Sequence, residues 1–140
     1  MVNVLMLDTE TVSMYELGYP LLRSRILSEP LYDIAVSVIT VEEQLKGWHK
    51  NAKQAKSEAQ LAIAHQNLTD NVRTLNDFHI VTFSEAAIRR CKFLPSLKLN
   101  VDGMDLRIAA IALEEDASVI TRNLRDFERV RQLKCENRAD

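Results

Sequence analysis

Residues 2–9, with the sequence VNVLMLDT, form a short apolar run that ends abruptly at Asp8 and Thr9. An uninterrupted apolar run of this length is typical of a buried strand that leads into a loop or a helix cap. Similar runs predict further strands at residues 34–39 (IAVSVI), 79–83 (HIVTF) and 118–120 (SVI), with a short edge strand at residues 133–135 (LKC). The sheet is therefore expected to consist of short strands, most of them buried.

Helical sequence separates these strands. Residues 9–15 predict a short helix, and Pro20 opens a second one because proline fits the first turn of a helix. Residues 41–77 repeat apolar side chains every three or four positions, which predicts a long helical stretch with a break near Asn51 or Asn67. Further helices are expected after the Ser84 cap, over residues 104–115 and over residues 123–129.

Alternating strands and helices, with strands that are apolar nearly throughout, are typical of a mainly parallel sheet covered on both faces. We therefore predict an α/β three-layer sandwich with a four- to five-stranded sheet flanked by helices. No linker, repeat or low-complexity tract divides the chain, so residues 1–140 are expected to form one domain.

The overall composition narrows the class of protein. Hydrophobic residues make up 46% of the chain and charged residues 27%, as in ordinary globular proteins. The net charge of -2 provides no general basic field, so a nucleic-acid partner would need a local basic patch. The two cysteines cannot build a disulfide framework, and no signal peptide or membrane-spanning run is evident. These features predict a cytoplasmic protein with no membrane association.

Four acidic residues lie near the expected ends of the strands. In open α/β sheets, ligands bind beyond the carboxyl ends of the strands. Asp8 follows the first strand, Glu43 lies one helical turn beyond Thr40 after the second, and Asp126 comes shortly after the fourth. Asp105 opens the helix that leads into the fourth strand. These positions predict one shared acidic pocket.

Each acid also has a purely structural interpretation. Asp8 could be a helix N-cap, and Glu43 could complete a Thr-x-x-Glu capping box. Asp105 could offset a helix dipole, and Asp126 could be a solvated charge beside Arg125.

The structural interpretation is weakest for Asp105. Ala109 and Ala112 follow it on the same helix face, and this stripe of small side chains predicts close packing against the sheet. A carboxylate at the top of a buried stripe must be paired, hydrogen-bonded or bound to a metal. Crowded carboxylates also raise each other's pKa, a conflict that a divalent cation removes. Oxygen donors alone favour Mg²⁺ or Mn²⁺ over zinc.

Four segments of the chain resemble the PIN domain in order and spacing: LDT at 7–9, SVITVEE at 37–43, MDLRIAA at 104–110 and VITRNLRDF at 119–127. The similarity is closest to the VapC-type toxin ribonucleases of bacterial toxin–antitoxin modules. This resemblance implies hydrolysis of RNA phosphodiester bonds that depends on Mg²⁺ or Mn²⁺. It also implies a homodimer, and a small antitoxin protein whose tail blocks the site.

The resemblance assigns the metal and catalytic roles to Asp8, Glu43, Asp105 and Asp126. The pocket around them is expected to include Thr9, Thr121, Arg122 and Asn123. Arg122 belongs to a set of flanking arginines that are expected either to hold adjacent phosphates or to be ordinary surface charges: Arg107, Arg122 and Arg125.

The chain departs from the family pattern at two places. Glu10 stands where the family usually has asparagine or aspartate, so it is either an additional member of the site or a flaw in it. Residues 135–140 lack the usual acid–tryptophan ending, which should affect the last strand more than the chemistry.

Two alternative functions remain. A PIN-like module that has lost catalysis and kept partner binding would retain the fold but bind metal weakly. A receiver-like signalling domain needs a lysine after a late strand, and no predicted strand is followed by one.

Overall fold

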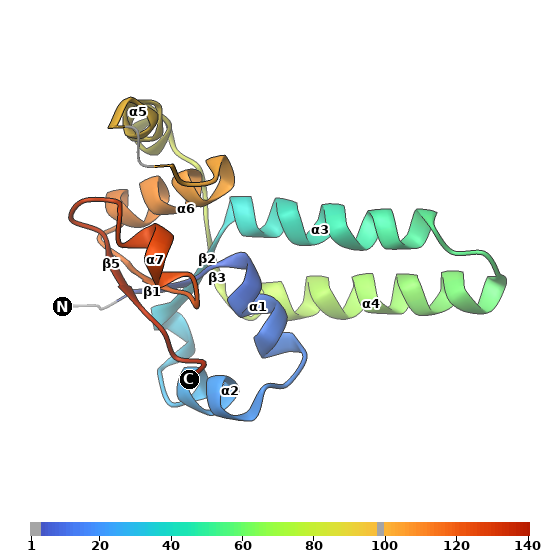
Figure 1. The fold of residues 1–140 in the computed structure, drawn as a ribbon. Coiled ribbons are helices and arrows are strands. Elements are labelled where there is room, and N and C mark those ends of the chain that lie inside the picture. Colours follow the sequence, from blue (N-terminus) through green and yellow to red (C-terminus); the bar gives the residue numbers. More distant parts are fainter. Residues whose placement is uncertain (1–3, 98–99) are drawn as a thin grey trace.

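The computed structural model describes residues 4–97 and 100–140, so the first two residues of the predicted strand at 2–7 lie outside the described part. Five strands form one sheet in the order β3-β2-β1-β4-β5, and all neighbouring pairs are parallel. The strands are β1 Leu5–Leu7, β2 Ile34–Ser37, β3 His79–Val81, β4 Ser118–Ile120 and β5 Lys134–Glu136. The prediction of a mainly parallel sheet is confirmed, and β1 lies at its centre (Figure 1).

Helices connect the strands as expected from the parallel arrangement. The helices are α1 Thr9–Glu16, α2 Pro20–Leu27, α3 Val38–Lys53, α4 Glu58–Asn76, α5 Glu85–Phe93, α6 Gly103–Glu114 and α7 Leu124–Phe127, with short 3-10 turns η1 Leu31–Asp33 and η2 Leu94–Leu97. Within the described residues, no helix is both long and apolar enough to cross a membrane.

Two apolar layers cover the two faces of the sheet. Alternate residues of β1 separate them: Met6 packs with α5 and α6, whereas Leu5 and Leu7 pack with α1, α2 and the end of α4. Ala109 and Ala112 of α6 are completely buried in the first layer, as the small-residue stripe predicted. The three-layer α/β sandwich is therefore confirmed.

The start of α3 differs from the prediction. β2 ends at Ser37, and the Ser37 side chain caps α3 by accepting a hydrogen bond from the backbone N–H of Thr40 at 3.1 Å. Thr40 lies inside the helix, so the predicted capping box of Thr40 and Glu43 is wrong. The β-branched residues of 34–39 run across the boundary, and the serine within them marks the true start of the helix.

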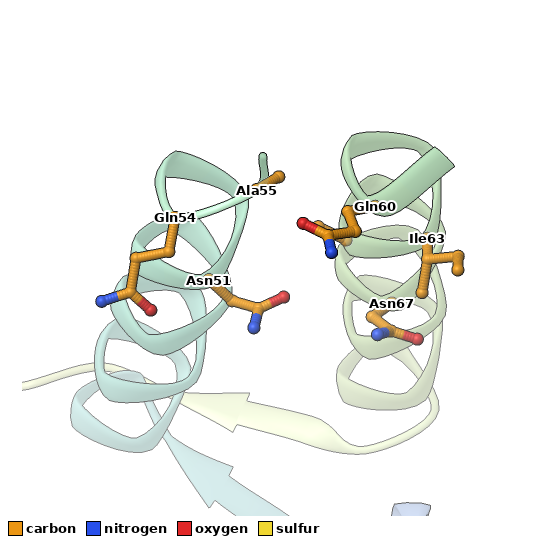
Figure 2. A pocket seen from close by; sticks show the side chains of 7 residues that line it. Asn51, Gln54, Ala55, Gln60, Ile63 and Asn67 are labelled. Atoms are coloured by element: carbon orange, nitrogen blue, oxygen red, sulfur yellow. The ribbon is translucent and has the colours of Figure 1, made fainter. Parts of the chain in front are cut away.

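α3 and α4 form a hairpin that extends away from the sheet (Figure 1). The predicted helical stretch over residues 41–77 is interrupted at residues 54–57, close to the expected break near Asn51. Far from the sheet, the two arms enclose a hollow of about 290 Å³ (Figure 2). None of its lining residues is titratable, so this hollow is distinct from the acidic positions: Asn51, Gln54, Ala55, Gln60, Ile63, Ala64 and Asn67.

Candidate functional site

Asp8 lies directly beyond the central strand and is buried, with 5% of its surface exposed. It caps α1, since its Oδ1 accepts a hydrogen bond from the backbone N–H of Thr11 at 3.0 Å. Its other oxygen, Oδ2, accepts a hydrogen bond from the Thr121 hydroxyl at 2.6 Å. The N-cap interpretation is therefore confirmed, but only one of the two carboxylate oxygens serves the cap.

The loop after β4 links Asp8 to two other acids. The Thr121 hydroxyl accepts a hydrogen bond from the backbone N–H of Asn123 at 2.8 Å. The Asn123 side-chain amide then donates to Asp126 Oδ2 at 3.0 Å and makes a long contact of 3.5 Å with Asp105 Oδ2. Thr121 and Asn123 therefore lie among the acids, where the sequence placed them.

Glu43 reaches the same edge of the sheet from α3. The Thr9 hydroxyl donates to Glu43 Oε1 at 2.6 Å and lies 3.2 Å from the Thr40 hydroxyl. Glu43 thus contacts the helix that Asp8 caps, which is a different role from the capping box predicted for it. Thr9, placed in the pocket by sequence, is the residue that makes this contact.

The electrostatics of Asp105 show that the acids share one environment. Two causes together raise the pKa of Asp105 from its ordinary 3.8 to about 6: first burial, and then the charges of the neighbouring carboxylates Asp102, Asp8, Glu43 and Asp126. Asp102, which caps α6 by accepting from the backbone N–H of Met104 at 2.8 Å, was not among the predicted acids. An aspartate just before a helix start was the sequence signal that could have identified it.

Asp126 joins the group from the short helix α7. It is half-buried on α7, accepts the hydrogen bond from Asn123, and lies 3.8 Å from Arg129. These contacts exclude the interpretation of a simple solvated charge beside Arg125.

The three arginines that flank the acids in sequence lie on the surface. Arg122 Nη1 lies 3.5 Å from Glu10 Oε1, and both side chains are largely exposed. Arg107 and Arg125 are also exposed. Glu10 therefore pairs with a surface arginine, in contrast to Asp8, which is buried at the sheet.

The donor set matches a hard divalent cation in its chemistry. The charges of four carboxylates, Asp102, Asp8, Glu43 and Asp126, act on Asp105, and carboxylate oxygens are the ligands that Mg²⁺ and Mn²⁺ prefer. As they stand, no three histidine, cysteine or acidic side chains among residues 4–97 and 100–140 converge to hold a metal. The charge and the oxygen donors of these acids fit such an ion, although their side chains do not converge in this structure.

Comparison with known proteins supports the fold and the family. The PIN domain family matches residues 6–133. A structure of VapBC2 from Rickettsia felis bound to a promoter DNA fragment is 25% identical, with a TM-score of 0.75, and the match covers 96% of this chain and 98% of that one. VapBC-1 from nontypeable Haemophilus influenzae gives 22% identity and a TM-score of 0.77, with 98% of this chain and 99% of that one covered.

A DNA-bound VapBC from Salmonella typhimurium gives 24% identity and a TM-score of 0.76, with 96% and 98% covered. No curated protein matches the chain significantly, so the family match and the solved structures carry the comparison. The family match extends over most of the chain and includes all four predicted site acids. The chain therefore belongs to the PIN domain family.

Proposed function

We propose that this protein is an endoribonuclease that depends on Mg²⁺ or Mn²⁺ and is the toxin of a toxin–antitoxin pair. The observation that carries the proposal is the chain of contacts at the carboxyl end of the parallel sheet, in which Thr121 links Asp8 to Asn123, and Asn123 contacts Asp126 and Asp105. Burial and these neighbouring acids raise the pKa of Asp105. Acids that perturb each other in this way are frequent at functional sites. Membership of the PIN domain family makes nuclease chemistry the natural use of such a cluster.

Asp8, Glu43, Asp105 and Asp126 are the residues that would hold the ion. A bound divalent ion would neutralise these carboxylates, lower the pKa of a bound water and offset charge on the phosphate during hydrolysis. Asp105 carries a proton on its carboxyl group below about pH 6 and gives it up above that value.

The neighbouring polar residues orient these acids. Thr121 and the backbone of Thr11 fix both oxygens of Asp8, so this carboxylate has one defined direction. Asn123 donates to Asp126 and contacts Asp105, and Thr9 donates to Glu43. Fixed carboxylates lose little conformational entropy when they take up a ligand.

The proposed partners follow from the surface charges and from the related structures. The exposed side chains of Arg107, Arg122 and Arg125 are suited to contact RNA phosphates on either side of the acids. The similar solved structures are VapBC complexes, and this supports a small antitoxin protein as a partner. We further propose a homodimer located in the cytoplasm.

One observation favours a second function, a PIN-like binding module without catalysis. Glu10 is engaged in an exposed ion pair with Arg122, and no three metal-ligand side chains of the described residues converge. Under this alternative, the purified protein binds Mn²⁺ weakly and cleaves no RNA.

The test is cleavage of a panel of structured and unstructured RNAs by the purified chain with Mg²⁺ or Mn²⁺. We expect cleavage that EDTA abolishes and that Asp8→Asn and Asp105→Asn remove. Asp116→Asn is the matched control, because Asp116 is an exposed acid that pairs with Lys134 on the surface, and it should cleave like the wild type. A folded wild-type protein that cleaves no RNA with either metal would contradict the proposal.

A further inference from the structure

Two buried amides connect the α3–α4 hairpin to the first turn of α1, where Asp8 and Thr9 lie. Gln44 of α3 is 7% exposed and Asn71 of α4 is fully buried. Neither residue has a charge or a nucleophilic group, and neither was singled out by the sequence. Their hydrogen bonds show what they hold in place.

Gln44 fixes the main chain at Thr9. Its Nε2 donates to the backbone carbonyl of Thr9 at 3.1 Å and to the Ser13 hydroxyl at 2.9 Å. Both amide hydrogens of Gln44 are thereby used within α1. Gln44 therefore contacts the main chain of Thr9, the residue that directly follows Asp8 and donates to Glu43.

Asn71 fixes the orientation of Gln44. Its Nδ2 donates to Gln44 Oε1 at 2.7 Å and to Glu16 Oε2 at 2.8 Å. If the Asn71 amide were turned over, its oxygen would face two acceptors, so this network determines its orientation. A Gln44 amide turned over would likewise place its oxygen against the Thr9 carbonyl.

Asn71 makes these bonds at a cost to stability. Its Oδ1 is enclosed and has no hydrogen-bond partner among the described residues. An unsatisfied buried acceptor destabilises the folded state, so packing alone does not explain an asparagine at this position. The arrangement is therefore better explained by the two donor contacts than by the stability of the core.

We propose that Gln44 and Asn71 are positioning residues for the acidic cluster. Gln44 holds the Thr9 main chain so that the Thr9 hydroxyl meets Glu43 and Asp8 keeps its place. Asn71, which also donates to Glu16, contributes by orienting the Gln44 amide. This inference rests on the proposed function, because it assigns the two amides to the same site. Neither residue touches RNA or the metal in this assignment.

The experiment compares Gln44→Leu, Asn71→Leu and the double variant with Asn67→Leu as control. Asn67 and Gln44 both line a second cavity, which residues of α1, α3 and α4 border. Asn67 lies one helical turn from Asn71 but makes none of these hydrogen bonds. For each protein, kcat and KM are measured on an RNA that the wild type cleaves. The dissociation constant of Mn²⁺ is measured by calorimetry, and the melting temperature checks the fold.

We expect Gln44→Leu to lower kcat and to weaken Mn²⁺ binding, each about tenfold, as loss of an outer partner of a metal site commonly does. KM should change less than about twofold, because the RNA-facing arginines are unaffected. The double variant should be no worse than Gln44→Leu alone, since Asn71 acts through Gln44. Asn67→Leu should match the wild type in kcat and Mn²⁺ affinity.

Wild-type kcat and Mn²⁺ affinity in Gln44→Leu would overturn the inference, as would additive losses in the double variant. If Asn71→Leu does not fold, Asn71→Ser takes its place in the same cycle with the same expectations. A wild-type chain that cleaves no RNA is a different result, because it refutes the proposed function and the inference together.

Discussion

Asp8 and Asp105 lie at the same edge of the sheet, but their surroundings stabilise a negative charge to different degrees. Asp8 has a hydrogen-bond donor on each oxygen, one from the start of α1 and one from Thr121. Among the described residues, Asp105 makes one long contact, with Asn123, and burial and neighbouring acids raise its pKa to about 6. Hydrogen-bond donors stabilise the ionised form of a buried carboxylate, whereas burial near other negative charges destabilises that form.

The difference shows how to separate structural and functional acids in this site. Asp8 contributes to the fold even before any ligand binds, because it caps a helix and satisfies a buried hydroxyl. The raised pKa of Asp105 implies that its ionised form lowers the stability of the fold at neutral pH. A carboxylate kept at the expense of stability is the stronger sign of a binding or catalytic role.

Asp8→Ala should have the largest effect on stability. The substitution removes the cap of α1 and leaves the buried Thr121 hydroxyl without its acceptor, which together should cost about 3 kcal/mol of unfolding free energy. Urea unfolding monitored by circular dichroism measures this loss. Asp8→Asn should lose less, because the amide oxygen can keep the cap. Equal stability of Asp8→Ala and the wild type would mean that these hydrogen bonds do not hold the site together.

Asp105→Asn should have a smaller effect of the opposite sign. The folded pKa of about 6 exceeds the ordinary 3.8, so the folded state binds more protons than the unfolded state between these values. The wild type therefore loses stability from this group as pH rises through that window. With EDTA present at about pH 7.5, the variant should be more stable by about 1 to 2 kcal/mol after allowance for solvent screening.

This gain should shrink as pH falls below about 6 and disappear near about pH 3, where Asp105 is protonated in both the folded and the unfolded wild type. Thermal melts of both proteins across this pH range provide the measurement. A gain that stays constant with pH would show that the effect is not due to the charge of Asp105.

Arg122→Ala should have the smallest effect on stability. Arg122 makes an exposed ion pair with Glu10, and such a pair contributes less than about 1 kcal/mol. If Arg122 also contacts RNA, KM for the RNA substrate should rise and depend less on salt, with kcat nearly unchanged. Lys134→Ala, which breaks a similar surface pair with Asp116, is the control and should leave KM unaltered.

The parallel sheet and the position of the acids were accessible from sequence because buried strands of a parallel sheet are apolar throughout. Each such strand places its next polar residue at one common edge. This reasoning located Asp8, Thr121 and Asn123, which prove to be linked by hydrogen bonds. It also placed Asp105 above a buried alanine stripe.

The parts that sequence did not reveal depend on contacts between distant segments. Ser37 and Thr40 are both plausible caps in a β-branched run, and only the end of β2 distinguishes them. Glu43 had a local partner in the predicted capping box, whereas its actual partner, Thr9, lies on another helix. Gln44 and Asn71 are ordinary polar residues of two helices until the hairpin brings them onto α1.

The most direct test of the central claim is the relative stability of the wild type and Asp105→Asn with and without Mn²⁺. In EDTA at about pH 7.5 the variant should be the more stable protein, because it lacks a destabilising charge. In saturating Mn²⁺ the order should reverse, because the ion binds and stabilises only the intact acidic site. A variant that remains the more stable protein in Mn²⁺ would contradict the assignment of Asp105 to a metal-binding catalytic centre.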